Sequence, residues 1–225
     1  MQQLVSTPQV EFLRDLRREV DHNYAHGRVI VAVDGMTGSG TRAFADEFAR
    51  VFGETRREVF RSSIDDFHRP RAERYRLGRD SAEGYYRESF DYGTLRRVLI
   101  DPFRMGGSTG FQTAAFDTAR DAPVVSSWRT ADADAVLLID GIFLLRPELR
   151  GSWNFSVYLD VPPALAYERL ALTDRRDPDP EAESNARYLG GRELYLAEAE
   201  PFFAASAVVD NTDQEHPRRV FGDSC

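Results

Sequence analysis

The chain has 225 residues, of which 42% are hydrophobic, and a formal net charge of −8 with an isoelectric point near 5.1. This length favours one large domain over two. A constitutive nucleic-acid binder needs a basic face, so the acidic balance disfavours an arginine-rich nucleic-acid binder and we expect no nucleic-acid partner. All 29 basic residues are arginine. Any phosphate contact therefore falls to arginine side chains or to the backbone.

The cysteine content and the apolar runs indicate where the protein resides. The single cysteine, Cys225, is the last residue, which excludes an intrachain disulfide and favours a reducing compartment. No apolar run is long enough to span a bilayer, and the first ten residues lack the basic and apolar regions of a signal peptide. We expect a cytoplasmic protein with no membrane partner, and a homo-oligomer is left open.

The first elements in chain order are a helix, a strand and a second helix. Apolar residues at helical spacing from Val10 to Val20 predict an amphipathic helix within residues 1–27. Arg28 to Asp34 is a β-branched apolar run, typical of a strand buried on both faces of a parallel sheet. Gly35 ends this strand, and helical spacing resumes from Arg42 to Phe52. The segment predicts a glycine loop between a strand and a helix.

Four further strands are predicted, at Glu58–Ser63, Ala135–Ile139, Phe155–Val161 and Ala207–Asp210. Helical stretches such as Ser184–Glu200 alternate with them. This alternation predicts an α/β fold, a three-layer sandwich with a five-stranded parallel sheet and helices on both faces. No repeat or linker divides the chain, so residues 1–225 are expected to form a single domain.

Two segments depart from this alternation. Residues 71–134 carry one predicted helix, near Thr94–Ile100, in otherwise irregular sequence, and we expect a substrate-side insertion. Residues 173–183 are charged and proline-rich, which predicts a surface lid. Arg175 and Arg176 lie on this lid, where guanidinium groups can stabilise the charge that develops during phosphoryl transfer. Arg187 and Arg192, on the next helix, are expected to form an ordinary charged face.

The glycine loop nearly matches the phosphate-loop pattern G-x-x-x-x-G-K-[ST], in which backbone N–H groups surround the phosphates. Thr41 stands at the lysine position and Arg42 at the hydroxyl position that binds magnesium. The strand before the loop and the helix after it favour a nucleotide site over a purely structural turn. The predicted nucleotide-binding residues are Gly35, Met36, Thr37, Gly38, Ser39, Gly40, Thr41 and Arg42.

Acidic residues follow the next two strands, at the edge where open parallel sheets bind ligands. Asp65 and Asp66 follow the second strand, and Asp140 follows the third. In phosphoryl transfer one carboxylate accepts the proton of the attacking hydroxyl and another lies beside Mg²⁺. This order suits Asp65 as the base and Asp140 as the metal-side acid, although aspartates at strand ends also cap turns and helices.

Tyrosines alternate with arginines beyond the second strand. Tyr75, Tyr85 and Tyr86 lie among six arginines, a composition suited to stacking on a base and pairing with phosphate. A solvated, flexible insertion is the alternative. His68 has no second histidine or cysteine at ligand spacing, so a substrate contact or a structural role is expected rather than a metal.

Four stretches occur in the order VDGMTGSGTRAFADEFA, SSIDDFHRP, AVLLIDGIFLL and RLALTDRRDPDP. From Arg28 to about Asp213 this order resembles the uridine kinase and phosphoribulokinase group of P-loop kinases. RPRAERYRLGRDSAEGYYRESFDYGTL and VVDNTD look like the actinobacterial-type uridine kinase-like proteins. The resemblance implies a phosphate donor, ATP or GTP, with Mg²⁺, and a small-molecule acceptor, a nucleoside or a sugar.

The resemblance also assigns residues. Asp65 becomes the base for the acceptor hydroxyl, and Phe67 and His68 complete its motif, with His68 in place of the family tyrosine. Asp140 takes the place of a family glutamate near magnesium. Phe116–Asp117 is similar to the family's nucleoside-pocket pair.

The stretch GYYRESFD aligns with the ribose-binding region of the family. Its acids are Glu88 and Asp91, and neither is identified as the ribose-binding aspartate. Tyr86 and Glu88 are predicted substrate contacts on this alignment.

Thr41 and Arg42 depart from the family pattern. Bacterial phosphoribulokinases also carry Gly-Thr in place of Gly-Lys, so Thr41 is compatible with kinase activity. Arg42 repels a cation, which leaves two alternatives. Either Thr41 supplies the magnesium hydroxyl, or Arg42 contacts the β or γ phosphate in place of lysine. The leading hypothesis is a kinase, and the rivals are a catalytically impaired nucleotide-binding or regulatory protein and a phosphoribulokinase-like sugar kinase.

Overall fold

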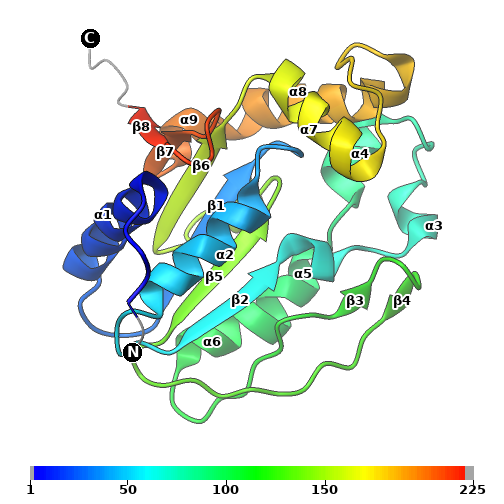
Figure 1. Ribbon diagram of the computed structural model, residues 1–225. Coiled ribbons are helices and arrows are strands. Elements are labelled where there is room, and N and C mark those ends of the chain that lie inside the picture. The colour runs from blue at the N-terminus through cyan, green and yellow to red at the C-terminus, as the bar shows by residue number, and fades with distance from the viewer. Residues whose placement is uncertain (1–2, 221–225) are drawn as a thin grey trace.

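The computed structural model describes residues 3–220 and is built on a six-stranded sheet in the order β2-β5-β1-β6-β7-β8 (Figure 1). The strands are β1 (Val29–Gly35), β2 (Val59–Ser63), β5 (Val136–Gly141), β6 (Phe155–Asp160), β7 (Ala207–Asp210) and β8 (Arg218–Val220). The first five are parallel. They are the five predicted strands, with bounds that differ by at most two residues.

β8 is an addition to the predicted sheet. It pairs antiparallel with β7, with Val220 opposite Val208 and Arg218 opposite Asp210. Its sequence, Arg-Arg-Val, is too short and too polar to show a strand period. The sheet is therefore mixed at this edge, as is common for doubly wound folds.

Helices cover both faces of the sheet, which confirms the three-layer α/β fold. Val29, Val31 and Val33 of β1 pack on one face against α1 (Pro8–Asn23) and α2 (Thr41–Phe52). Ile30 and Ala32 face the opposite layer. That layer contains α4 (Ala82–Glu88), α5 (Tyr92–Leu95), the π-helical segment Arg96–Ile100, α6 (Asp101–Met105) and α8 (Ala186–Ala199).

Residues 71–134 are more regular than expected. One helix was predicted near Thr94–Ile100, but the helical stretch runs from Tyr92 to Met105, and α3 (Arg71–Arg74), α4 and the short strands β3 (Phe116–Asp117) and β4 (Ala122–Pro123) accompany it. α4 is too short for a periodic pattern. Its packing on α8 is close, because a Cβ at Gly191 would lie 2.6 Å from the Tyr85 ring.

The segment predicted to be a lid, residues 173–183, contains fewer loop residues than expected. α7 (Pro163–Asp174) includes the first two residues of the predicted segment, and Arg175, which follows it, has a φ of +56°. The short 3₁₀ helix Glu183–Asn185 begins after Ala182. Asn185 Nδ2 donates to the carbonyl oxygens of Asp177 and Asp179 at 2.9 and 2.7 Å. These two hydrogen bonds connect the loop to the 3₁₀ helix that follows it. The remaining short elements are the 3₁₀ helices Ile64–Phe67 and Pro147–Leu149, and α9 (Pro201–Ala204).

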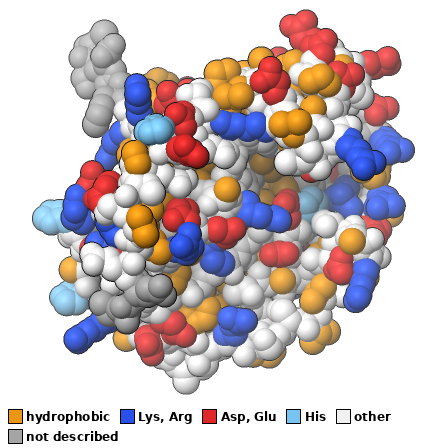
Figure 2. Space-filling view, viewed as in Figure 1, with side chains coloured by type: hydrophobic (Ala, Val, Ile, Leu, Met, Phe, Trp, Pro, Cys, Tyr) orange, Lys and Arg blue, Asp and Glu red, His pale blue; other side chains and the backbone are white. Residues whose placement is uncertain are grey.

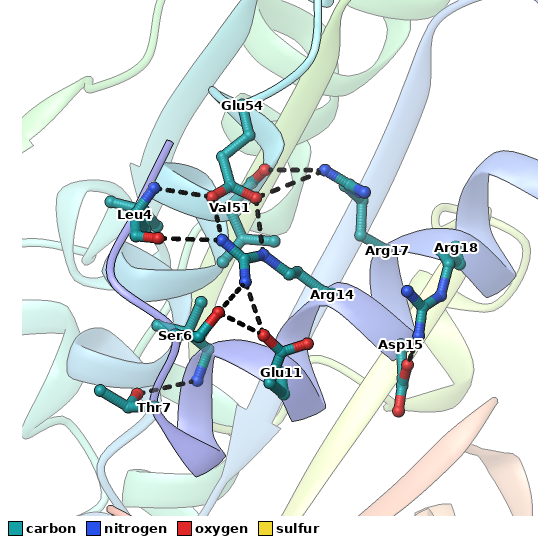
Figure 3. A network of polar contacts seen from close by, with 11 residues as sticks. Leu4, Ser6, Thr7, Glu11, Arg14, Asp15, Arg17, Arg18, Val51 and Glu54 are labelled. Atoms are coloured by element: carbon teal, nitrogen blue, oxygen red, sulfur yellow. Dashed lines mark hydrogen bonds and ion pairs between the residues drawn. The ribbon is translucent and has the colours of Figure 1, made fainter. Parts of the chain in front are cut away.

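A polar network attaches α1 to the end of α2 (Figure 3). Thr7 caps α1 by accepting the Val10 N–H. Arg14 pairs with Glu54 at 2.5 Å and with Glu11 at 2.7 Å. The Arg14 hydrogen bond holds the pKa of the Glu54 carboxyl down, at about 2. α1 is thereby fixed on its face of the sheet.

None of the helices within residues 3–220 is both long and apolar enough to cross a membrane. Cys225 lies outside the described residues.

Candidate active site

The glycine loop joins β1 to the first turn of α2. Gly38 and Gly40 have φ angles of +86° and +90°, which only glycine adopts readily. A Cβ on Gly38 would lie 2.4 Å from the carbonyl oxygen of Ala166 in α7. The loop therefore takes its shape from glycine and presents the first N–H groups of α2, as a phosphate site requires.

Polar side chains from other elements hold this loop in place. Arg169 Nη1 donates to the Gly38 carbonyl at 3.5 Å, and Asn211 Nδ2 donates to the Ser39 carbonyl at 2.8 Å. The Thr37 hydroxyl lies 3.2 Å from the Tyr85 hydroxyl. Elements from three parts of the chain thus fix one loop.

A buried carboxylate lies directly under the loop. Asp34 accepts the Gly35 N–H at 2.8 Å, the Leu145 N–H at 3.3 Å and the Tyr195 hydroxyl. Burial raises the pKa of Asp34 to about 7, and the Tyr195 hydrogen bond opposes this shift. Sequence reasoning did not identify this pair, because Tyr195 reaches Asp34 only through the packing of α8 on the sheet.

The predicted acids meet at the carboxyl ends of neighbouring strands. β2 and β5 pair with Ser63 opposite Asp140, and Asp65 follows two residues later in a 3₁₀ turn. Asp140 is buried, whereas Asp65 is exposed. Burial raises the pKa of the Asp140 carboxyl, and the Arg61 charge opposes the shift.

One cleft of about 1010 Å³ joins the loop and the acids. Figure 2 shows the hollow on this face, with basic and acidic side chains around it. The predicted residues that line it are Thr37, Gly38, Gly40, Thr41, Arg42, Asp65, His68, Asp140 and Arg176. The site thus has the volume of a small-molecule pocket, with the glycine loop and carboxylates in its walls.

Neither a protein-family model nor a curated protein sequence matches the chain. Solved structures do match. One described as a possible uridine kinase from Bacillus stearothermophilus superposes with a TM-score of 0.70 at 24% identity, over 89% of this chain and 96% of that chain. A D-glycerate 3-kinase from Cryptococcus neoformans var. grubii gives 0.54 at 10% identity, over 94% and 97%. A Saccharomyces cerevisiae protein described as a candidate P-loop containing kinase also gives 0.54 at 10%, over 85% and 95%.

The chain therefore shares the α/β fold of these structures. At these identities the likeness concerns the fold alone.

Two guanidinium groups lie against the two predicted carboxylates. Arg42 donates to Asp65 at 3.3 Å, and Arg61 on β2 pairs with Asp140 at 2.7 Å and with Asp46 at 2.9 Å. Within residues 3–220 no group of three His, Cys, Asp or Glu side chains is arranged to hold a metal. The donor set does not fit a magnesium ion held by the protein's carboxylates. Thr41 and Asp140 remain a predicted metal pair.

His68 lies at the cleft beside Asp65. Its Nδ1 donates to the Asp65 carbonyl at 2.8 Å, and its ring lies 4.5 Å from that of Phe90. Burial lowers the pKa of His68, so the ring is neutral near pH 7. The geometry makes His68 a neighbour of the predicted base, with Nε2 left as an acceptor.

Several predicted residues lie outside the lining of the cleft. Tyr86 is buried under Arg146, 4.2 Å from its guanidinium, and its neighbour Tyr85 lines the cleft instead. Glu88 pairs with Arg69 and Arg76 at 3.1 and 3.0 Å. The other predicted residues outside the lining are Gly35, Met36, Ser39, Phe67, Phe116, Asp117 and Arg175. Of these, Gly35 and Met36 border a second cavity of about 20 Å³.

Asp117 accepts the N–H groups of Ala119 and Arg120 at 2.9 and 3.1 Å. It therefore caps the turn between β3 and β4.

The cleft also contains side chains that sequence reasoning did not assign. Tyr188 and Arg187 of α8 line it, although Arg187 was expected on an ordinary charged face. Arg61 was missed as well. Its signal was a charged residue inside an otherwise apolar and small strand, a position that needs a buried partner.

Proposed function

We propose that the protein is a nucleotide-dependent kinase that transfers the γ-phosphate of ATP or GTP to the hydroxyl of a small nucleoside-like or sugar molecule. One observation carries the proposal: Asp65 and the glycine loop face the same cleft, at the carboxyl ends of parallel strands. Asp65 is the proposed base, the loop from Gly35 to Thr41 holds the phosphates, and Arg176 lies near the γ-phosphate.

In the proposed reaction a carboxylate oxygen of Asp65 accepts the proton of the acceptor hydroxyl. The hydroxyl oxygen forms a bond to the γ-phosphorus while the bond from that phosphorus to the β–γ bridging oxygen breaks. The nucleoside diphosphate leaves, and Asp65 returns its proton to solvent. Magnesium, expected from the resemblance, stays a prediction.

Arg42 has to leave Asp65 for this reaction. The two side chains are 65% and 53% exposed, so their ion pair is weak. Arg42 directly follows Thr41 of the glycine loop. A polyphosphate bound in the loop is therefore a stronger partner for Arg42 than Asp65 is, because it carries several negative charges. We propose that nucleotide binding moves Arg42 onto the phosphates, in place of the usual loop lysine, and frees Asp65.

The test measures nucleoside diphosphate release by purified protein with ATP or GTP and a panel of nucleosides and pentose phosphates. The variant Asp65→Asn is expected to lose turnover by about 100-fold or more, because general-base catalysis contributes that much, while nucleotide affinity changes little. Asp66→Asn is the matched control, because Asp66 lies outside the cleft lining, and it is expected to retain turnover. Equal release by wild type and Asp65→Asn would refute the kinase proposal.

The rival, an impaired nucleotide-binding or regulatory protein, is favoured by Thr41 and Arg42. The double variant Thr41→Lys, Arg42→Thr separates the two. A large gain in turnover from an inactive wild type supports the rival, whereas loss of an existing turnover supports a role for Arg42 in the native loop.

A further inference from the structure

Three arginines and two tyrosines alternate along one wall of the cleft. The guanidinium carbons of Arg74 and Arg187 lie 5.7 and 5.1 Å from the ring centre of Tyr75. Arg187 and Arg176 lie 5.4 and 3.9 Å from the ring centre of Tyr188. All five residues line the cleft, and we call them the arginine–tyrosine wall. Cation–π contact fixes the guanidinium groups without neutralising them.

Two of these arginines have no carboxylate partner within residues 3–220. Arg74 pairs with Asp121 at 3.4 Å, but neither Arg176 nor Arg187 forms an ion pair with any described side chain. Arg187 is only 8% exposed, and its Nη1 donates to the Arg79 carbonyl. The buried atoms Arg187 Nε and Arg176 Nη1 have no hydrogen-bond partner in this part of the chain. A buried guanidinium left this way is costly unless an anion compensates it.

The two ends of the wall face different substrates of the proposed reaction. Arg176 follows α7, whose Arg169 contacts the phosphate loop, so Arg176 lies at the donor end. Arg74 and Tyr75 close α3, a few residues beyond Asp65 and His68, so they lie at the acceptor end. In the proposed reaction the γ-phosphate of the nucleotide neutralises Arg176. Arg187, which lies between the two ends of the wall, is then left without a counterion.

We infer that the phosphate acceptor is itself an anion, a small molecule whose phosphate or carboxylate group is bound by Arg187 and Arg74 while its hydroxyl reaches Asp65. This inference rests on the proposed kinase function and narrows its substrate class. A neutral nucleoside or sugar would leave Arg187 uncompensated. A planar guanidinium suits both anions, because its N–H groups bind two oxygens at once.

The experiment uses matched acceptors that differ in one charged group: ribose and ribose 5-phosphate, uridine and uridine 5′-monophosphate, glycerol and glycerate. With the intact protein and ATP, at least one charged member is expected to exceed its neutral partner in kcat/KM by about 30-fold or more, the effect of a buried charge pair. The phosphate and carboxylate pairs distinguish the two sources of negative charge. Equal kcat/KM within every pair, with transfer observed, would overturn the inference and leave the kinase intact.

Variants of the wall arginines test which residue causes the preference for charged acceptors. Arg187→Gln is expected to abolish the preference for charged acceptors, and Arg187→Lys to retain part of it, since lysine keeps the charge without the planar fork. Arg74→Gln tests the half-buried end of the wall if Arg187→Gln fails to fold. Arg18→Gln, on the exposed side of α1, is the control and is expected to keep the full preference. An unchanged preference in both Arg187→Gln and Arg74→Gln would refute the assignment.

Binding separates this inference from the kinase proposal. If no acceptor pair supports transfer, calorimetric titration of the same compounds is decisive. Tighter binding of the charged members, lost in Arg187→Gln, keeps the anion site and removes the kinase. Equal or absent binding of charged and neutral members overturns both.

Discussion

The floor and the wall of the cleft differ in how their charges are balanced. On the floor, Asp65 and Asp140 each lie against a guanidinium group, at 3.3 and 2.7 Å. On the arginine–tyrosine wall, Arg176 and Arg187 lie against tyrosine rings and have no carboxylate partner within residues 3–220. The floor is thus nearly neutral before any ligand arrives, whereas the wall carries charge that a ligand can neutralise. Negative substrates are expected to bind by the wall and the glycine loop, and to react at the floor.

The largest expected effect is that of Gly38→Ala. At this position a Cβ would meet the backbone of Ala166 at 2.4 Å, so the loop has to move and nucleotide affinity is expected to fall by about 100-fold or more. Gly27→Ala is the matched control, because its φ of +87° is similar but nothing lies within 4 Å. It is expected to lower the free energy of unfolding by about 1 kcal/mol through backbone strain alone. Titration with a nucleotide and denaturant unfolding measure both, and equal nucleotide affinity in the two variants would contradict the loop assignment.

The second largest effect is expected for Arg61→Gln, which removes the guanidinium group that neutralises Asp140 on the floor. Asp140 is then buried without its cation, and the free energy of unfolding is expected to fall by about 3 kcal/mol near neutral pH. The pKa of Asp140, already raised by burial, rises further, so the folded state holds a proton that the unfolded state releases. The loss is therefore larger at pH 8 than at pH 4.

Asp46→Asn is the control for Arg61→Gln. It removes only the exposed partner of Arg61 and is expected to cost about 0.5 kcal/mol or less. A similar loss in the two variants would show that Asp140 does not depend on Arg61.

A pH-dependent effect is expected for Asp34, which lies beneath the glycine loop. Its pKa is raised to about 7, so the folded state keeps the proton between pH 4 and 7 while the unfolded state loses it. Its contribution to stability is present below pH 4 and is lost as the pH rises to 7, by about 1 to 4 kcal/mol. Denaturant unfolding of wild type and Asp34→Asn across this range is expected to show a shallower decline in the variant. Parallel curves would mean that Asp34 titrates normally.

The sheet and the floor could be predicted from sequence because their signals are local. β1 is one apolar run that ends in glycine, and the acids come directly after β2 and β5. Parallel strands bring their carboxyl ends to one edge, so order along the chain was enough to place Asp65 near Asp140.

The composition around Tyr75 and Tyr85 indicated that this segment could bind a ligand. Which of its side chains face the cleft could not be predicted, because packing rather than local pattern determines it. Tyr85 and Tyr86 are neighbours on α4, about 100° apart around the helix axis. Only the contact with α8 decides that Tyr85 faces the cleft and Tyr86 the core. Arg187 likewise resembles any arginine on a charged helix until α3 and α4 bring Tyr75 and Tyr85 beside it.

The side-chain hydrogen bonds that hold the glycine loop affect the entropy of ligand binding. Arg169 donates to the carbonyls of Gly38, Asn211 and Thr212, and Asn211 donates to that of Ser39. The backbone of the loop is thus ordered before any phosphate arrives, and its ordering is part of the folding free energy rather than of the binding free energy. Arg42, proposed to take the place of the loop lysine, has to give up its ion pair with Asp65 when the nucleotide binds. Such preorganisation offsets part of that loss, since little conformational freedom remains to be removed on binding.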